Sequence, residues 1–502
     1  MAKKSIWTGL VFSGVVLAQA PAIAPRGIVN AASQMPASLP GGKLAPVARI
    51  IIPGLRLTSP GSPTVIHLKS GDWKASIAPV KATGVRIEAD LPADLPAGEI
   101  QISVETSQGV SSAQTVASAH SSPGIFTLNG AGWGPVNRNE VRRRQKTTIR
   151  VNGLNDAHPK LFVGGVAARV VSVRGQDLTF TVPQGAPEGC WTPMWIESAP
   201  GRVSNFAALR IAARNGVCQQ PEGWPLRPVA AGKRGGIVIA TRIQGILELR
   251  RGQPDEFTLD SAAAFFFRAG DGTPTPFQTL PPAGTCTSYT GEFSLISDLL
   301  FRAQRFIGEF TAPLDLGPRL TIGDGARSAK LPSKKVEGQY SAAVGGMAPV
   351  IWGPGAPLFL SPGQYRVRSA DSKFDVPIEV SPGFDWVNRK EVQEVDRGSG
   401  VRLQWTGVGA DRQMVIAAFN VHPDSSAMGT CVCVALPGAT QMDVPPYALA
   451  NFPPTERFTP VPIRGVILAT IPQSAGGQIP PTAFDDVRAA FIDIRAQMVS
   501  FR

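Results

Sequence analysis

Residues 161–182 read LFVGGVAARVVSVRGQDLTFTV, and this stretch decides the fold. Apolar and polar residues alternate in much of it, which is the spacing of a strand with one buried face. The pairs Gly164-Gly165 and Arg174-Gly175 interrupt the alternation and are typical of tight turns between antiparallel strands. The stretch therefore predicts three short strands in succession, joined by two turns.

The same pattern recurs along the chain, for example at 99–104, 147–151 and 401–405. The 502 residues include 53 glycines and 46 prolines, against roughly 12% for the two together in average proteins. This composition excludes a coiled coil and argues against one large helical domain. Helical spacing occurs at only two places, 292–306 and 481–490. The expected fold is all-β and built of sandwiches, because strands with one apolar face need a second sheet to cover that face.

The N-terminus predicts an export signal. Two lysines precede an apolar stretch from Ile6 to Leu17, which is shorter than the roughly 20 residues that span a bilayer. We assign residues 1–24 as a signal peptide and expect a periplasmic, cell-surface or extracellular protein; the alternative is an uncleaved anchor. Small residues offer three cleavage positions, after Ala18, Ala20 or Ala24.

The five cysteines are expected to form disulfides, because export makes oxidation available. Cys190 and Cys218 flank a strand, turn and strand, and form the first expected pair. Cys286 then pairs with Cys431 or Cys433, which lie two residues apart and point to the same face of one strand. One thiol remains in either case. A C-x-C pair without a second pair is a poor zinc site, so no metal or cofactor is expected.

Basic residues outnumber acidic ones, and the net charge is +12. The densest basic cluster spans 138–150. Its candidate anion-binding patch comprises Arg142, Arg143, Arg144 and Lys146. The alternatives are a solvated linker and a surface for an anionic polymer or membrane. Nucleic acid is not the expected partner, because no aromatic residues interleave with the cluster and no nucleic-acid motif accompanies it.

The tryptophans divide into two groups. Four lie in predicted strands and are expected to face the core, with sugar stacking as the alternative: Trp191, Trp195, Trp386 and Trp405. Trp133 and Trp224 lie in Gly- and Pro-rich linkers and are the better candidates for exposed ligand stacking.

Two segments resemble a known group. GIVNAAS (27–33) and SPGIFT (122–127) are similar to the start of exported, largely uncharacterised proteins abundant in Acidobacteria. LFVGGVAA (161–168) and VSNF (203–206) resemble the domain that follows. The resemblance implies tandem immunoglobulin-like domains of the IPT/TIG type, and residues 236–502 resemble the β-rich end of the same group.

The expected organisation is therefore tandem immunoglobulin-like β-sandwiches followed by one or two further sandwich domains. Its boundaries are 1–24 for the signal peptide, 27–128 for the first IPT/TIG domain, 129–140 for a linker, 141–213 for the second IPT/TIG domain, 214–235 for a linker, 236–384 for a β-rich third domain and 385–502 for a β-rich fourth.

Catalytic motifs are absent from the sequence. The chain has four histidines and no H-E-x-x-H, G-x-S-x-G or P-loop pattern. We therefore expect a non-enzymatic surface scaffold, adhesion or ligand-binding protein, with an extracellular protein or polysaccharide as partner. The alternatives are a carbohydrate-binding protein and a polysaccharide hydrolase. A hydrolase would pair Asp385 or Asp396 with Glu391 or Glu394.

Overall fold

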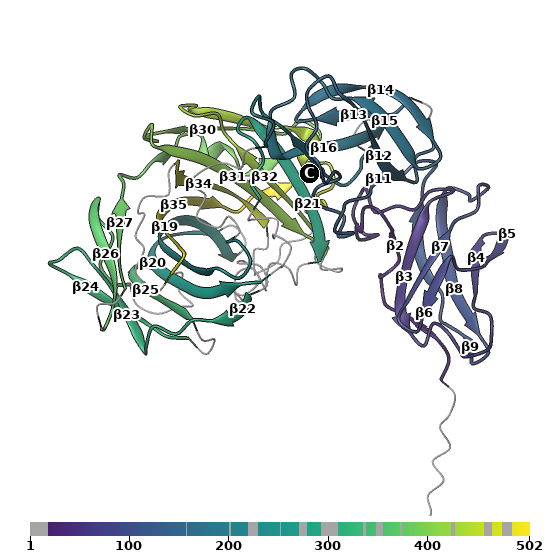
Figure 1. Cartoon of the computed structure of the whole chain (residues 1–502), viewed down its shortest axis with the longest axis horizontal. Coiled ribbons are helices and arrows are strands. Elements are labelled where there is room, and N and C mark those ends of the chain that lie inside the picture. Colours follow the sequence, from purple (N-terminus) through teal and green to yellow (C-terminus); the bar gives the residue numbers. More distant parts are fainter. Residues whose placement is uncertain are drawn as a thin grey trace, which may run out of the picture.

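Strands make up almost all the regular structure, as the alternating sequence predicts (Figure 1). The computed structural model describes residues 19–156, 158–199, 202–218, 229–250, 253–270, 279–292, 310–334, 338–347, 355–371, 374–422, 427–455, 464–473 and 484–502. The all-β fold with tandem sandwiches is confirmed.

The first sandwich consists of two five-stranded sheets. One contains β1 (Ala22–Ile23), β2 (Val29–Asn30), β3 (Arg49–Leu55), β6 (Lys81–Thr83) and β7 (Arg86–Asp90). The other contains β4 (Val65–Ser70), β5 (Trp73–Ile77), β8 (Gly98–Thr106), β9 (Gly109–Val110) and β10 (Gln114–Ser118). On β8, Ile100, Ile102 and Val104 are buried while Glu99 and Gln101 are exposed. This alternation places one face of each strand in the core between the sheets.

Strand β1 lies inside the segment assigned to the signal peptide. Ala22 and Ile23 pair with Leu55 and Gly54 of β3, and Ile23 is buried in the first core. Cleavage after Ala24 would remove this strand, whereas cleavage after Ala18 or Ala20 would keep it.

The second sandwich is an eight-stranded arrangement in which 161–182 forms the predicted three strands. Its strands are β11 (Gly124–Ile125), β12 (Lys146–Asn152), β13 (Lys160–Val163), β14 (Val166–Arg174), β15 (Asp177–Thr181), β16 (Gly189–Ala199), β17 (Arg202–Val203) and β18 (Ala207–Ile211). Gly164 and Gly165 both adopt positive φ, 59° and 85°, in the turn between β13 and β14. Glycine is suited to this turn because it has no Cβ to clash in that conformation.

One nine-stranded sheet organises the C-terminal region. Its strands are β19 (Arg234–Arg250), β20 (Gln253–Ala269), β21 (Thr285–Glu292), β22 (Phe310–Pro313), β25 (Gln339–Met347), β31 (Arg412–Val421), β32 (Ala427–Val434), β34 (Arg464–Pro472) and β35 (Asp486–Gln497). Strand β35 lies in the middle, parallel to β19. The two halves of the sheet are therefore joined only when β35, near the end of the chain, has paired with both β34 and β19.

Two smaller sheets pack on this large sheet and make two separate cores. The first small sheet contains β23 (Arg319–Gly323), β24 (Ser328–Pro332), β26 (Gly363–Ser369) and β27 (Asp375–Val380). The second contains β28 (Asp385–Trp386), β30 (Val401–Thr406) and β33 (Gln441–Val444). The remaining short elements are η4 (Arg389–Glu391), β29 (Glu394–Val395), α2 (Pro446–Leu449) and β36 (Ser500–Phe501).

Two sequence expectations need correction here. The boundary between 236–384 and 385–502 separates the two covering sheets, but it cuts the shared sheet, because β19 pairs with β35 and β21 with β32. The described strands of 236–502 therefore form one unit, in which two large cores and two smaller clusters pack on the shared sheet. The helix expected at 481–490 is wrong from Asp486 onward, where β35 begins. Strand pairing on both sides of β35 overrides the local helical spacing. Most of the other expected helix, 292–306, lies outside the described residues.

The expected pair Cys190–Cys218 is confirmed, and the structure shows which of Cys431 and Cys433 bonds to Cys286. Cys190 bonds to Cys218, and Cys286 bonds to Cys433. Cys286 and Cys433 lie directly opposite each other in the pairing of β21 with β32. Cys431 instead faces Ser288 across the strands and stays a buried free thiol. Its burial raises the pKa of the thiol to about 12.

Buried asparagines hold the backbone at and beside the junction of the first two sandwiches. Asn30 and Asn205 belong to the motifs that carry the resemblance. Asn152 Oδ1 accepts a hydrogen bond from the Arg49 backbone N–H at 2.7 Å, and its Nδ2 donates to Asn30 Oδ1 at 2.8 Å. Asn205 Nδ2 donates to the carbonyls of Ile125 and Gly132. These side chains satisfy backbone groups that the junction removes from water.

We predict that the native protein does not react with iodoacetamide, because the one free thiol is buried and its pKa is raised. Unfolding in guanidinium without reductant should label Cys431 alone, as measured by intact mass and peptide mapping. Labelling of the native protein, or of any other cysteine before reduction, would contradict this assignment.

We predict that Asn152→Ala destabilises the protein, because it leaves the Arg49 backbone N–H without its partner at the junction. A buried unpaired group costs about 1–3 kcal/mol, so the melting temperature in calorimetry should fall by several degrees. Asn139→Ala is the matched control, since Asn139 is exposed. Equal melting temperatures for the two variants would show that the junction bond contributes nothing.

Candidate functional site

The second sandwich carries an aromatic patch on the outer face of its sheet. On β16, Met194 and Ile196 face the core, so Trp195 between them faces outward. Phe162 of β13 lies directly opposite Trp195 in the strand pairing, and their rings stack at 5.2 Å between centroids. Phe206 stacks on the other side of Trp195 at 5.0 Å. The patch would be solvent-exposed if the second sandwich stood alone.

The C-terminal region covers this patch through α2 and the residues that follow it. Pro446 at the first turn of α2 restricts the backbone there. The next residue, Tyr447, stacks on Trp195 with a centroid distance of 4.1 Å. Asn451 Nδ2 donates to the Ser204 carbonyl at 3.2 Å. Trp195 is consequently only 2% exposed. The contact fixes the second sandwich against the C-terminal region.

A cleft of about 810 Å³ opens beside this contact. Its apolar lining residues are Phe162, Trp195, Val203, Pro446, Tyr447 and Ala450. Its polar lining residues are Glu197, which follows Trp195 on the same face of β16, and Asp396, Arg397 and Arg502. An apolar wall with a few polar groups at a domain interface is the common composition of a small-molecule site.

Hydrogen bonds fix the orientation of two charged side chains in the cleft, Asp396 and Arg397. The Ser399 hydroxyl and the Gly398 backbone N–H donate to the Asp396 carboxylate and lower its pKa. Arg397 donates to the Phe452 carbonyl at 2.6 Å and to the Arg502 carbonyl at 3.1 Å, and burial lowers the pKa of its guanidinium. The cleft thus presents an ionised carboxylate next to an oriented cation.

The Tyr447 hydroxyl adds a donor to the apolar side. Burial raises its pKa to about 12, so the phenol stays protonated at neutral pH. In the part of the chain that the structure describes, no hydrogen bond occupies this hydroxyl. A Cβ on Gly165, in the turn between β13 and β14, would lie 3.7 Å from it. The turn at Gly165 and the Tyr447 hydroxyl therefore lie next to each other in the lining of the cleft.

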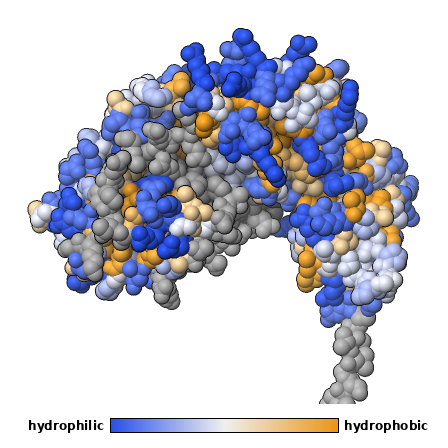
Figure 2. All heavy atoms as spheres, in the orientation of Figure 1, coloured by the Kyte–Doolittle hydropathy of each residue, from blue (hydrophilic) through white to orange (hydrophobic). Residues whose placement is uncertain are grey.

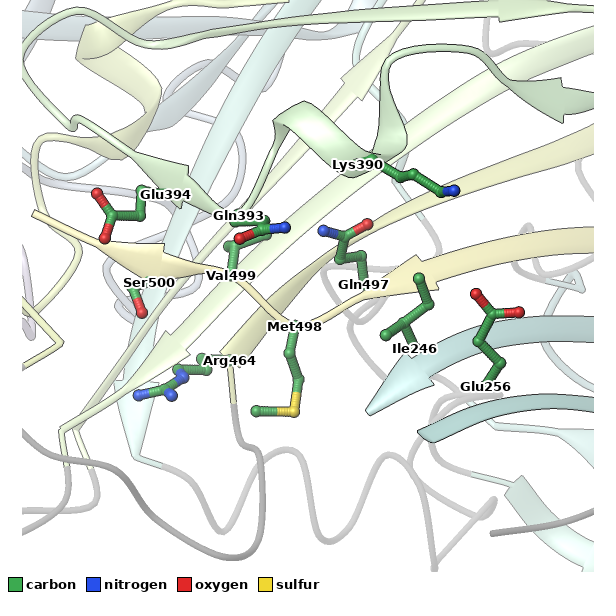
Figure 3. Close-up of a pocket in the computed structure, with 10 residues that line it drawn as sticks. All are labelled: Ile246, Glu256, Lys390, Gln393, Glu394, Arg464, Gln497, Met498, Val499 and Ser500. Atoms are coloured by element: carbon green, nitrogen blue, oxygen red, sulfur yellow. The ribbon is translucent and has the colours of Figure 1, made fainter. Parts of the chain in front are cut away.

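A second cavity of about 530 Å³ lies at the ends of β19 and β35 (Figure 3). Its lining includes Glu256, Glu394, Lys390 and Arg464. Figure 3 shows Glu256 and Glu394 at opposite ends of this cavity. Glu394 also forms an ion pair with Arg502. This second cavity is thus lined by acidic and basic side chains and, unlike the interdomain cleft, by no aromatic residue among those that the structure describes.

The carboxylates considered for hydrolysis do not share one site. Asp396 lines the interdomain cleft, whereas Glu394 lines the second cavity. Asp385 and Glu391 are exposed and line neither of these two cavities. Among the described residues there is also no group of three or more His, Cys, Asp or Glu side chains that could hold a metal ion.

The predicted ligand-stacking residues lie elsewhere. Trp133 is half-buried and packs edge-on against Tyr289 of β21, with 6.2 Å between centroids. It therefore joins the linker to the C-terminal region instead of forming an open platform. Trp224 lies outside the described residues. Trp386 and Trp405 are buried in the core, as expected.

The predicted basic patch is only partly available. Arg142, Arg144 and Lys146 are exposed. Arg143 is half-buried, donates to the Ala186 carbonyl at 2.7 Å and pairs with Glu188 at 3.4 Å. Arg143 is thus engaged within the second sandwich.

Sequence reasoning missed Phe162, Glu197 and Tyr447. A signal for the first was present: Phe162 occupies the outward position between Leu161 and Val163 of a short strand. An aromatic residue at an outward position indicates a surface that something else covers. The covering residue, Tyr447, is 285 positions away, and no local pattern connects the two.

No family model matches the chain, and no curated protein matches it. Among solved structures it is similar to an SGBP-B protein from a mixed-linkage glucan utilization locus of Bacteroides ovatus, in complex with a mixed-linkage heptasaccharide. That match has 13% identity and a TM-score of 0.22, and covers 45% of this chain and 65% of that one, slightly under two thirds of its length.

Two further matches are as distant. An SGBP-B from a complex xyloglucan utilization locus in Bacteroides uniformis is 12% identical with a TM-score of 0.19, covering 65% of this chain and 86% of that one. A titin fragment is 10% identical with a TM-score of 0.14, covering 71% and 92%. Similarity at this level carries no argument about function. Among the described residues, no helix has the length and apolar character needed to cross a membrane.

We predict that the Tyr447 contact makes the protein sensitive to alkali. With a pKa near 10 when unfolded and about 12 when folded, the unfolded state loses its proton first. Stability from this group is therefore complete below pH 10 and falls between pH 10 and 12. Tyr447→Phe should show a smaller loss of melting temperature over that range. Identical pH profiles would show that the phenol is not buried in solution.

Proposed function

We propose that this is an exported, non-enzymatic β-sandwich protein that works as a rigid ligand-binding scaffold. The observation that carries the proposal is the interdomain cleft, which is lined by aromatic side chains together with charged groups of both signs. Two disulfides support export, because such bonds persist in oxidising compartments. We also propose that the chain belongs to the acidobacterial group, on the sequence motifs at 27–33, 122–127, 161–168 and 203–206 that carry the resemblance.

A carbohydrate is the ligand class that this cleft favours. Sugar rings present an apolar face that packs on aromatic side chains, and Phe162 and Tyr447 are both only partly buried at the cleft. Sugar hydroxyls need donors and acceptors together. The Tyr447 hydroxyl and Arg397 donate, while Glu197 and Asp396 accept. The volume of about 810 Å³ is within the usual range for ligand sites.

The test is a binding screen of the mature protein against neutral glycans, with tryptophan fluorescence as the readout at low and high salt. Binding in the cleft should alter the emission of Trp195 and should change little with salt. Calorimetry then gives the dissociation constant of the best glycan. Silence across the panel would reject the carbohydrate ligand and leave a protein partner for the scaffold.

We predict that Glu197→Gln raises the dissociation constant of that glycan about tenfold, because a bond to a charged acceptor contributes about 1.5–3 kcal/mol. Tyr447→Phe should raise it several-fold without disturbing the ring stack. Glu99→Gln is the matched control, since Glu99 is an exposed acid on β8. Equal affinities for Glu197→Gln and this control would place the glycan outside the cleft.

A further inference from the structure

A second surface of the second sandwich lies away from the cleft, on the outer face of β12, β15 and β14. Strand pairing arranges nine side chains there in three rows. The rows are Lys146–Thr181–Arg169, Thr148–Thr179–Ser172 and Arg150–Asp177–Arg174. The residues between them, such as Ile149, Leu178 and Phe180, face the core. We call these nine residues the basic face.

The basic face carries four cations and one carboxylate. Lys146, Arg150, Arg169 and Arg174 are all exposed, and Asp177 is the acid among the nine. Within the described residues, none of the four cations has an ion-pair partner within 4.0 Å. This distinguishes the face from Arg143, whose charge is already paired with Glu188.

The four cations lie at the corners of an array that the strand pairing defines. Neighbouring strands are about 4.8 Å apart, so the Cα atoms of Lys146 and Arg169 lie about 10 Å apart across β15, as do those of Arg150 and Arg174. Along β12, Lys146 and Arg150 are about 13 Å apart. A shift in register between Val170 and Ser172 keeps Arg169 and Arg174 on the same side of β14. The array thus repeats positive charge in two directions.

Hydroxyl groups fill the centre of the array. Thr148 and Thr179 hydrogen-bond through their hydroxyls at 2.8 Å, and Thr181 and Ser172 lie beside them. At one corner, Arg150 donates to Gln176 at 2.7 Å and packs over the Phe126 ring at 5.0 Å, which orients its guanidinium. Arg142 and Arg144 continue the positive charge beyond Lys146. Figure 2 shows hydrophilic side chains projecting at the top of the molecule, where Figure 1 places this sandwich.

We propose that the basic face binds a linear acidic polysaccharide whose repeating sugars carry carboxylates. Guanidinium groups match the geometry of carboxylates, and the central hydroxyls match those of the sugars. The proposal rests on charge and register in the second sandwich alone, and is independent of the cleft.

Two other classes of anionic partner fit the basic face less well. A single-stranded nucleic acid needs aromatic side chains on which bases stack, and none of the nine residues is aromatic. A membrane surface favours apolar or aromatic residues that insert between headgroups. Among the described residues of β12, β14 and β15, Val171 is the one large apolar side chain that is exposed, at 46%.

The experiment measures binding of the full chain to oligogalacturonate by calorimetry, with neutral dextran and duplex DNA as comparison probes. We expect oligogalacturonate to bind, with an affinity that weakens strongly with added salt, because exposed charges are screened over about 8 Å at physiological ionic strength. Dextran should not bind. Tighter binding to DNA than to oligogalacturonate, equal binding to dextran, or no binding to any probe would each overturn the proposal.

Variants then locate the site. The combination Lys146→Gln, Arg169→Gln and Arg174→Gln should weaken oligogalacturonate binding at least about tenfold. The matched control removes the same charge from the first sandwich, by Lys69→Gln, Lys74→Gln and Lys81→Gln, and should change the affinity less than twofold. Equal weakening by both triples would show that net charge, and not the array, is responsible. Glu197→Gln should leave this affinity unchanged, so failure here is distinct from failure of the proposed cleft.

Discussion

The stacking of Tyr447 on Trp195 is the contact on which the arrangement of the site depends. Trp195 points out of its own sandwich because its neighbours on β16 fill the core. This outward face can be buried only by residues from outside the second sandwich. Tyr447 of α2, in the C-terminal region, is such a residue. The cleft exists because the two units meet along one edge of the aromatic patch and leave the other edge open. A polar residue in place of Trp195 would remove both the contact and the wall of the cleft.

The C-terminal region depends on strand pairing between the two ends of a long segment. Strand β19 pairs in parallel with β35, about 250 residues later. Buried carboxylates connect the large sheet to the loops around it: Asp260 accepts the backbone N–H groups of Phe359 and Leu360, each at 2.8 Å. Arg242 balances that charge. Because a buried charge without its partner is costly, these pairs secure the loops as well as the strands.

Polar side chains at and beside the junction of the first two sandwiches bond to groups far away in the sequence. Asn30 and Asn152 bond to each other across the junction, and Asn205 bonds to Ile125 of β11 and to Gly132 in the loop after it. Each of these asparagines satisfies backbone groups that would otherwise be buried unpaired. The first two domains are therefore held at a set orientation, which a flexible linker would not provide.

The sequence by itself determined most of the strands, although not the start of β35, together with the turns between β13 and β15 and the bond between Cys190 and Cys218. Each depends on alternation or on residues close along the chain. Tertiary structure decided that Cys286 bonds to Cys433, that 236–384 and 385–502 share a sheet, and that Tyr447 covers Trp195. Alternation shows that a strand has two faces, but what covers each face depends on packing between segments hundreds of residues apart. The cleft is formed by such packing. The sequence predicted that Trp195 faces the core of its own domain, whereas it lies on the outer face of its sheet and is buried by Tyr447.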